Sequence, residues 1–312
     1  MKPRLLQHGR LPDALEARLA AQYDVHPFWQ ERDPAAFLAA HGHEFVALTT
    51  RAAHGADAGL IGALPALRVI SSFGVGLDKI DLEAARARGI AVGFTPDVLN
   101  DCVADAAFAL LMDVARGISA ADRFVRRGDW PRAAFPLSTR VSGKRLGIVG
   151  MGRIGKVIAR RSQGFDMEVR YHTRGPADGV PYAHEPSLEA LARWSDFLVI
   201  ATAGGPQTRG LVSASVIEAL GPQGFLINIA RGSVVDEEAL VRALAAGRLG
   251  GAGLDVFAHE PEVPDALLGL DNVVLLPHIA SNTRETRQAM ADLVERNLAH
   301  FFQHGKVREA AI

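Results

Sequence analysis

Residues 144–155 read KRLGIVGMGRIG, a short apolar run that leads into three glycines spaced Gly-x-Gly-x-x-Gly. The run at 144–149 has the length and composition of a buried strand, and residues 153–163 continue with the periodicity of a helix. The glycine pattern alone is weak evidence, but a strand before it and a helix after it are the context that a dinucleotide requires. The stretch therefore predicts the first strand, turn and helix of a doubly wound α/β domain.

Each position of the turn has a physical reason for its residue. Gly150 permits the tight turn, Gly152 lets the backbone approach a pyrophosphate, and Gly155 lets helix and strand pack closely. Arg153 and Ile154 begin the helix, whose first amides and partial positive charge favour a phosphate. We take these five residues as candidate cofactor contacts.

The next strand, at residues 167–171, indicates which dinucleotide binds. A carboxylate at its end would accept hydrogen bonds from the ribose hydroxyls of NAD. The chain instead has His172, Thr173 and Arg174 there. A forked cation beside a hydroxyl suits a 2′-phosphate, so the sequence predicts NADP, with NADPH as the reductant.

Strands and helices alternate along the whole chain, which predicts parallel sheets covered by helices. The first block has apolar runs at 4–7, 45–48, 67–71 and 90–93, with helical stretches at 13–21, 34–40 and 82–88. After a long apolar helix at 102–114 comes the glycine-rich unit, and a final helical stretch at 284–302 has no strand to follow. Residues 126–136 have the composition of an irregular arm.

We expect two Rossmann-like α/β domains. Residues 1–98 and 285–312 would form a flavodoxin-like substrate-binding domain that the last helix completes, and residues 99–284 the NADP-binding domain. A chain of 312 residues exceeds what one core usually holds.

Composition narrows the function classes. The chain has 34 Lys and Arg against 35 Asp and Glu, spread along its length, which argues against a nucleic-acid partner. No stretch approaches a membrane span or a signal peptide. The single cysteine, Cys102, forms no internal disulfide and is expected to pack in the core or on a helix surface. We expect a cytoplasmic protein without a membrane or metal partner.

Three chemically active residues each follow an apolar run near the far end of the chain: Arg231, Glu260 and His278. A cation, an acid and an imidazole at the carboxyl ends of parallel strands face the crevice where such sheets bind ligands. Imidazole titrates near neutral pH and suits proton transfer, a carboxylate beside it would fix its tautomer and favour its charged form, and an arginine fork would orient a carboxylate and stabilise an oxyanion. This trio predicts hydride transfer to a 2-keto acid.

Several long motifs in one order carry a family resemblance: SSFGVGLD from Ser71, TPDVLN from Thr95, GMGRIG from Gly150, NIARGSVVDE from Asn228, GLDVFAHEP from Gly253 and LPHIA from Leu276. Through these motifs nearly the whole chain resembles the D-isomer-specific 2-hydroxyacid dehydrogenases. It is most similar to their NADP-dependent glyoxylate/hydroxypyruvate reductases and to plant hydroxyphenylpyruvate reductases.

The resemblance implies the catalytic trio, a homodimer built on the cofactor domains and a substrate-carboxylate loop. That loop comprises Phe73, Gly74, Val75 and Gly76, and successive amides at its end suit an anion. Trp130, in the irregular arm, is a further candidate for substrate contact, in its own or the neighbouring subunit, with a packing role left open. Further cofactor contacts are expected at Ala201, Thr208, Ile229, Ala230, Asp255 and Ala280.

Two other function classes remain as alternatives, and one loop departs from the family's usual sequence. A non-catalytic NADP-binding protein and a methyltransferase on a Rossmann sheet would both keep the fold, but neither requires the trio. After the strand at 197–201 the family usually continues Pro-Leu-Thr, whereas this chain has Ala203-Gly204-Gly205, which predicts a more open loop near the cofactor. Glyoxylate, hydroxypyruvate, 2-ketogluconate and aryl pyruvates share the reacting group, so the sequence leaves the substrate open.

Overall fold

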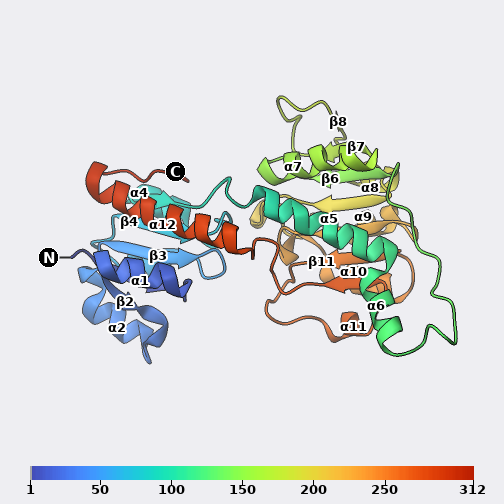
Figure 1. Ribbon diagram of the computed structural model, residues 1–312. Coiled ribbons are helices and arrows are strands. Elements are labelled where there is room, and N and C mark those ends of the chain that lie inside the picture. The colour runs from blue at the N-terminus through green and yellow to red at the C-terminus, as the bar shows by residue number, and fades with distance from the viewer. Residues whose placement is uncertain (1) are drawn as a thin grey trace. The chain divides into compact units, whose positions relative to one another are not determined.

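The computed structural model describes residues 2–312, which form two compact α/β units. Unit 1 comprises residues 2–99 together with 283–312, and unit 2 comprises residues 100–282. Each unit has its own parallel sheet with helices on both faces (Figure 1).

The sheet of unit 1 has the strand order β2-β1-β3-β4-β5, with every pair parallel. This is the flavodoxin-like order, and it confirms the fold expected for the N-terminal block. Its strands are β1 Arg4–His8, β2 Asp24–Pro27, β3 Ala47–Arg51, β4 Val69–Phe73 and β5 Ala91–Gly93.

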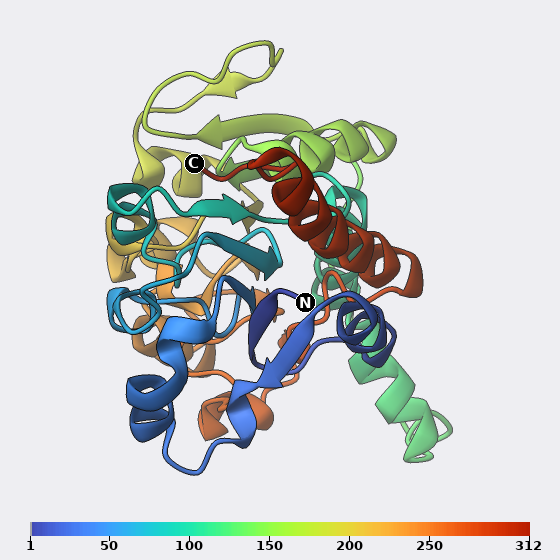
Figure 2. The ribbon, with the colours of Figure 1, turned by 90° about the vertical axis from the view of Figure 1, so that its left-hand side faces the viewer.

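Helices cover both faces of this sheet. On one face lie α1 (Asp13–Gln22) and α12 (Arg284–His304), dark blue and dark red in Figure 2. The other face packs a core of Leu6, Leu48, Ile70 and Val92 against α2 (Pro34–His41), α3 (Ala58–Gly62) and α4 (Leu82–Ala87). Alternate side chains of each strand therefore serve the two helix layers, as the strand period of two requires.

The last helix is joined to the sheet by a buried polar contact. The Asn297 side chain of α12 donates to the carbonyl oxygen of Phe94 at 3.0 Å, and its oxygen accepts from the amides of Arg308 and Glu309. Gly93 leaves the room for it, because a Cβ there would lie 2.8 Å from the Asn297 side chain. The C-terminal segment thus completes the N-terminal unit, as the sequence predicts.

Unit 2 contains a seven-stranded parallel sheet in the order β12-β11-β10-β9-β6-β7-β8. Its first strand, β6, lies at the centre, with later strands added to both sides, which is the Rossmann arrangement. The strands are β6 Arg145–Val149, β7 Glu168–His172, β8 Ala183–His184, β9 Phe197–Ile200, β10 Phe225–Asn228, β11 Gly251–Leu254 and β12 Val273–Leu275.

One face of this sheet is covered by α5 (Asn100–Arg116) and α7 (Arg153–Ser162), the other by α8 (Leu188–Trp194), α9 (Ala214–Leu220) and α10 (Glu237–Ala245) (Figure 1). The remaining helices are α6 Ile118–Arg126 and α11 Asp265–Leu268, and short 3-10 helices lie at Phe28–Gln30, Gly42–Glu44, Gln163–Phe165, Pro206–Thr208 and Gly232–Val234. After α6 the chain runs without regular structure until β6, as expected of the arm.

Candidate active site

The glycine-rich turn joins β6 to α7 as the sequence predicts. Gly150 has φ +100°, and its amide donates to the carbonyl oxygen of His172 at 2.9 Å. A Cβ on Gly150 would lie 2.7 Å from the amide nitrogen of Thr202, and one on Gly155 would lie 2.1 Å from the carbonyl oxygen of Gly150. Glycine at both positions is therefore required by the close approach of β6, α7 and the end of β9.

Gly152 differs from the other two glycines because a Cβ there would meet no atom within 4 Å. It is the N-cap of α7, whose first two residues are Arg153 and Ile154. No acidic residue lies in the first turn of this ten-residue helix. An open cradle at an unopposed helix N-terminus fits the pyrophosphate of a dinucleotide.

At the end of β7, two of the three predicted ribose-phosphate residues are engaged with the backbone. The His172 ring lies with Nδ1 3.0 Å from the carbonyl oxygen of Glu185, and the Thr173 hydroxyl donates to the carbonyl oxygen of Gly175 at 2.5 Å. Arg174 is exposed and donates one guanidinium nitrogen to the side-chain oxygen of Gln207 at 2.9 Å. The other guanidinium donors of Arg174 place positive charge at this strand end, where it suits a 2′-phosphate.

Side-chain hydrogen bonds hold the loop after β9. The Thr208 hydroxyl donates to the carbonyl oxygen of Ala203 at 2.7 Å, which closes the loop on itself. Together with the Arg174–Gln207 contact, this joins the loop to the end of β7. Ala201 and Thr208 are partly buried on the same loop.

Arg231 is positioned by the end of β10. The buried Asn228 side chain donates to the carbonyl oxygen of Arg231 and accepts from the amide of Ala230, each at 3.0 Å. Ile229 and Ala230, which lie between Asn228 and Arg231 in the sequence, are buried, and Arg231 is half-buried. Asn228 was not among the expected site residues, although a polar residue at the end of a buried strand indicates such a role.

A close backbone contact brings the Arg231 loop to the loop that carries Glu260. A Cβ on Gly232 would lie 1.9 Å from the carbonyl carbon of Phe257, so only glycine fits directly after the arginine. The amide of Ala258 donates to the side chain of Glu237 on α10 at 2.9 Å, which holds the second loop from its other side. Glu237, like Asn228, was not among the expected site residues.

Glu260 and His278 form the central pair of the site. Nδ1 of His278 lies 2.7 Å from Oε2 of Glu260, and Oε1 of Glu260 accepts from the amide of Phe257 at 3.1 Å. Burial acts to raise the pKa of Glu260, but the hydrogen bond and charge of His278, the Phe257 amide and the charge of Arg231 together hold it below the ordinary value. The structure therefore brings the imidazole, the carboxylate and the guanidinium into one electrostatic unit.

His278 adopts an uncommon backbone conformation, with φ +54°. Asp255, which is 1% exposed, holds it there: its carbonyl oxygen accepts from the His278 amide at 2.9 Å, and its two carboxylate oxygens accept from the amides of Ile279 and Ala280 at 2.7 and 3.0 Å. Burial raises the pKa of Asp255, while those two amides oppose the shift. Asp255 thus supports the histidine loop with both carboxylate oxygens.

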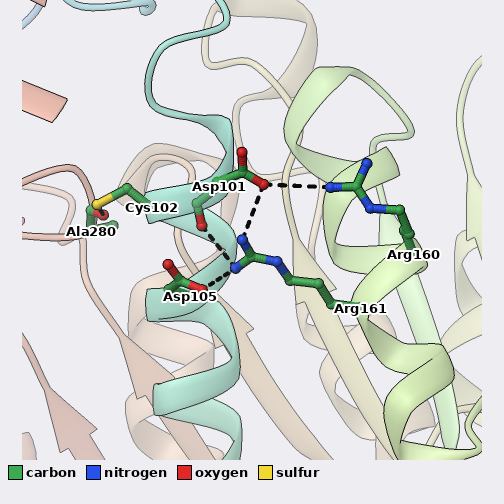
Figure 3. A network of polar contacts seen from close by, with 6 residues as sticks. All are labelled: Asp101, Cys102, Asp105, Arg160, Arg161 and Ala280. Carbon is green, nitrogen blue, oxygen red and sulfur yellow. Dashed lines mark hydrogen bonds and ion pairs between the residues drawn. The ribbon is translucent and has the colours of Figure 1, made fainter. Parts of the chain in front are cut away.

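Cys102 anchors the same loop from α5. Its thiol donates to the carbonyl oxygen of Ala280 at 3.0 Å (Figure 3). In the adjacent network, Asp101 and Asp105 of α5 form ion pairs with Arg160 and Arg161 of α7. These ion pairs join α5, which contacts the histidine loop through Cys102, to α7, which follows the glycine-rich turn.

The predicted substrate-carboxylate loop follows β4 in unit 1. Phe73 is the last residue of that strand and is 4% exposed, with the guanidinium of Arg287 5.5 Å from its ring centre. Gly74 has φ +149° and donates its amide to the hydroxyl of Thr95 at 3.1 Å. The amides of Val75 and Gly76 have no protein acceptor within residues 2–312.

Trp130 lies in unit 2, in the irregular segment after α6, with 69% of its surface exposed. Ile118, Val125 and Leu137 of the same region are also exposed apolar side chains. Most apolar residues of α5, in contrast, are buried by their own chain.

Across residues 2–312 no helix is both long and apolar enough to cross a membrane, and no group of three or more His, Cys, Asp or Glu side chains is arranged to hold a metal ion.

Known proteins share both the sequence and the fold. A family model for the D-isomer specific 2-hydroxyacid dehydrogenase NAD binding domain matches residues 108–280. The chain is 49% identical to hydroxyphenylpyruvate reductase of Plectranthus scutellarioides and 48% identical to glyoxylate/hydroxypyruvate reductase A of Arabidopsis thaliana, each over 288 residues and 92% of both chains. The solved NADPH-dependent glyoxylate/hydroxypyruvate reductase from Sinorhizobium meliloti, in complex with NADP and malonate, matches with a TM-score of 0.91 and 40% identity over 100% of this chain and 97% of that one.

The matches span both units, and the family model includes the glycine-rich turn, Arg231, Glu260 and His278. The chain therefore belongs to the D-isomer specific 2-hydroxyacid dehydrogenase family.

Proposed function

We propose that this protein is an NADPH-dependent reductase that converts a small 2-keto acid, of the glyoxylate or hydroxypyruvate type, into the D-2-hydroxy acid. The observation that carries the proposal is the 2.7 Å contact between Nδ1 of His278 and Glu260, with the charge of Arg231 acting on the same carboxylate. The identity with glyoxylate/hydroxypyruvate reductases supports the substrate class.

His278 is the proton donor in this proposal. Because Nδ1 faces a carboxylate, it carries a proton, and Nε2 is the nitrogen available to the substrate. In the charged imidazolium, Nε2 donates a proton to the keto oxygen as that oxygen gains charge, and the neutral ring accepts the proton back in the reverse reaction. Glu260 stabilises the charged form and fixes the ring orientation.

Arg231 and the loop after β4 hold the substrate. The guanidinium of Arg231 binds the substrate carboxylate and keto oxygen with its planar fork, which also stabilises the developing oxyanion. The amides of Val75 and Gly76, which lack a protein acceptor within residues 2–312, bind the carboxylate. Phe73 and Gly74 set the position of those amides, and Trp130 is a further substrate contact.

The cofactor is bound by unit 2. Gly150, Gly152, Arg153, Ile154 and Gly155 receive the pyrophosphate, and Arg174, with His172 and Thr173, receives the 2′-phosphate. The other proposed contacts are Ala201, Thr208, Ile229, Ala230, Asp255 and Ala280. When bound, NADPH supplies the hydride.

We further propose a homodimer that works in the cytoplasm. The support for the dimer is the exposed apolar surface of Ile118, Val125, Trp130 and Leu137 in the cofactor-binding unit. Several large exposed apolar side chains in one region of the sequence favour association. Sedimentation velocity at micromolar concentration is expected to give twice the mass of the chain.

A coupled assay tests the activity directly. We expect glyoxylate and hydroxypyruvate to drive NADPH oxidation, and chiral analysis of the hydroxypyruvate product to give the D isomer. The panel includes 2-ketogluconate and hydroxyphenylpyruvate, since larger tails share the reacting group. The L isomer would contradict the reaction geometry, and NADPH binding without oxidation of any keto acid would identify a non-catalytic cofactor-binding protein.

A further inference from the structure

The loop after β9 contains two glycines, and the second of them sets its shape. Gly205 has φ +136° and ψ 178°, a backbone conformation that residues with a side chain rarely adopt. A Cβ there would meet no atom within 4 Å, so the backbone conformation, rather than a lack of space, requires glycine. Gly205 precedes the 3-10 helix Pro206–Thr208, so it sets the direction of the single turn that carries Gln207.

Hydrogen bonds hold this turn on both sides. The Thr208 amide donates to the carbonyl oxygen of Gly205 at 3.2 Å, and the Thr208 hydroxyl donates to that of Ala203 at 2.7 Å. Beyond the turn, the Gly210 amide donates to the carbonyl oxygen of Ser233, in the segment after β10, at 2.8 Å. The side chain of residue 207 therefore extends from a backbone segment with a defined position.

Gln207 contacts Arg174 across the end of the central strand of the sheet. In the order β9-β6-β7, β6 lies between the two strands that these residues follow. Nη1 of Arg174 donates to Oε1 of Gln207 at 2.9 Å, which joins the loop after β7 to the loop after β9. The glycine-rich turn leaves the end of β6, so this contact lies at the edge of the sheet where a dinucleotide binds.

The loop that carries Arg174 is held as well. The Thr173 hydroxyl donates to the carbonyl oxygen of Gly175 at 2.5 Å, and Nε2 of His184 lies 2.9 Å from the carbonyl oxygen of Thr173. The Tyr171 hydroxyl accepts from the next part of this loop, the amide of residue 177, at 2.8 Å. Both loops are therefore ordered before a ligand binds, which lowers the entropy that binding must overcome.

The contact leaves hydrogen-bond donors on both side chains. A guanidinium group only donates, so the oxygen of the Gln207 amide faces Arg174, and its NH₂ group lies on the other branch. Within residues 2–312, neither that NH₂ group nor the other guanidinium nitrogens of Arg174 have a protein acceptor, and Arg174 has no carboxylate partner. Arg174 therefore keeps its positive charge beside a neutral donor.

The neutrality of the amide matters for the charge of this pair. A carboxylate of the same shape at position 207 would form an ion pair with Arg174, offset its charge and repel a phosphate. Glutamine presents the same oxygen atom to the guanidinium without adding a negative charge. The pair therefore offers a fixed cation and a neutral NH₂ group to one anion.

We propose that Gln207 is a specificity-determining residue of the cofactor site, which orients Arg174 through its side-chain oxygen and donates to the 2′-phosphate through its NH₂ group. This inference rests on the proposed function and deepens it, because it adds a neutral residue on the loop after β9 to the cation on the loop after β7. The ribose 2′-hydroxyl of NADH is uncharged, so it gains much less from the same donors. Gln207 therefore favours the phosphorylated dinucleotide.

The nucleotides 2′,5′-ADP and 5′-AMP test this assignment, because they differ only in the 2′-phosphate. Titration calorimetry gives the ratio of their Kd values for the wild type and for Gln207→Glu, which keeps the side-chain shape and replaces the donor with a charge. We expect Gln207→Glu to lower the preference for 2′,5′-ADP about 10-fold to 100-fold, the range for one charge-assisted hydrogen bond. The Kd for 5′-AMP should stay nearly unchanged. Gln207→Met, which is neutral and similar in length, should lower the preference less.

Two controls separate this role from general effects of charge and structure. Gln223→Glu adds the same charge in the exposed loop before β10, at the opposite end of the strands, and should leave the ratio at the wild-type value. In the Arg174→Ala background, Gln207→Glu should have a smaller effect, since part of its effect acts through the guanidinium. An unchanged preference in Gln207→Glu, an equal loss in Gln223→Glu, or the same effect in both backgrounds would overturn the proposal.

The same titrations distinguish failure of this inference from failure of the proposed function. They use no keto acid, so they test Gln207 even if no keto acid drives NADPH oxidation, a result that would make the proposed reaction wrong. A wild type that bound both nucleotides equally would refute the proposed NADPH preference and this inference with it. A wild type that preferred 2′,5′-ADP, with the same preference in Gln207→Glu, would refute this inference alone.

Discussion

His278 and His54 lie in equivalent places on two different sheets and have opposite surroundings. Each follows its strand by three residues, His278 after β12 and His54 after β3, at the carboxyl edge of a parallel sheet. His278 contacts the Glu260 carboxylate at 2.7 Å. Burial lowers the pKa of His54, and the charges of His8, Arg51 and Lys79 lower it further.

The difference teaches that the strand end brings a histidine to the edge of the sheet, but the neighbouring strand ends decide its electrostatic surroundings. The Glu260 carboxylate lies within hydrogen-bond distance of the His278 ring and fixes its orientation, whereas burial and the surrounding cations lower the pKa of His54. Similar positions in similar folds therefore give a histidine a carboxylate partner in one unit and cationic neighbours in the other.

The largest effect should come from removing the paired imidazole. His278→Ala is expected to lower kcat for hydroxypyruvate reduction by about 10²-fold to 10⁴-fold, the usual contribution of a general acid. NADPH affinity, measured by fluorescence titration, should change little. His304→Ala, at the exposed end of α12, is the matched control. If His278→Ala kept near-normal turnover, the contrast between the two histidines would have no catalytic meaning.

A smaller effect is expected at Arg174, whose guanidinium donates to the Gln207 side chain and has no carboxylate partner within residues 2–312. Arg174→Ala should raise KM for NADPH and leave KM for NADH nearly unchanged, so that the preference for NADPH falls by about 10-fold to 100-fold. Arg193→Ala, on α8 of the same unit, controls for loss of positive charge. Equal use of NADPH and NADH by the wild-type enzyme would show that Arg174 does not select the 2′-phosphate.

The smallest change should follow Glu260→Gln, which makes the surroundings of His278 more like those of His54. Without the carboxylate, the ring loses the acceptor that fixes its orientation, so kcat for reduction should fall by about 2-fold to 10-fold, the value of one hydrogen bond. A kcat equal to that of the wild type would remove Glu260 from its proposed role.

The same substitution has a signature in stability. The folded structure holds the pKa of Glu260 below its ordinary value, so the ionised carboxylate stabilises the fold above about pH 4.3, and this contribution is lost as the pH falls through the lowered value. The Tm difference between wild type and Glu260→Gln should therefore be largest near neutral pH and shrink in acid. A difference that grew in acid would contradict this sign.

Much of the fold follows from the apolar pattern because buried parallel strands are continuous apolar runs. The helices expected at 13–21, 34–40 and 284–302 correspond to α1, α2 and α12 with small changes at their ends. The runs at 45–48 and 67–71 lead to strands two residues later, Ala47–Arg51 and Val69–Phe73, because backbone pairing continues into Thr49, Thr50 and Arg51. The edge strand β2 was not expected, since Asp24–Pro27 is only partly buried and ends in proline.

The trio could be located from the sequence because each member follows a strand of one sheet within six residues, and parallel strands bring their carboxyl ends to one edge. The residues that position the trio could not be located in this way. Asp255 holds the His278 loop through amides 24 and 25 residues away, and Gly232 matters only because Phe257 approaches it. The cluster around His54 likewise depends on strand register and on the missing side chain of Gly9, neither of which leaves a motif.

Because α12 packs on the sheet of unit 1, the two units are completed in a set order during synthesis. Residues 100–282 form a continuous unit that can pack as soon as they leave the ribosome, because domains fold as units during synthesis. The first ninety-nine residues emerge earlier, yet the Asn297 contacts that seal β5 arrive with the last helix. The unit that is made first is therefore completed after the second unit, and until α12 has been synthesised its sheet keeps one face that only α1 covers.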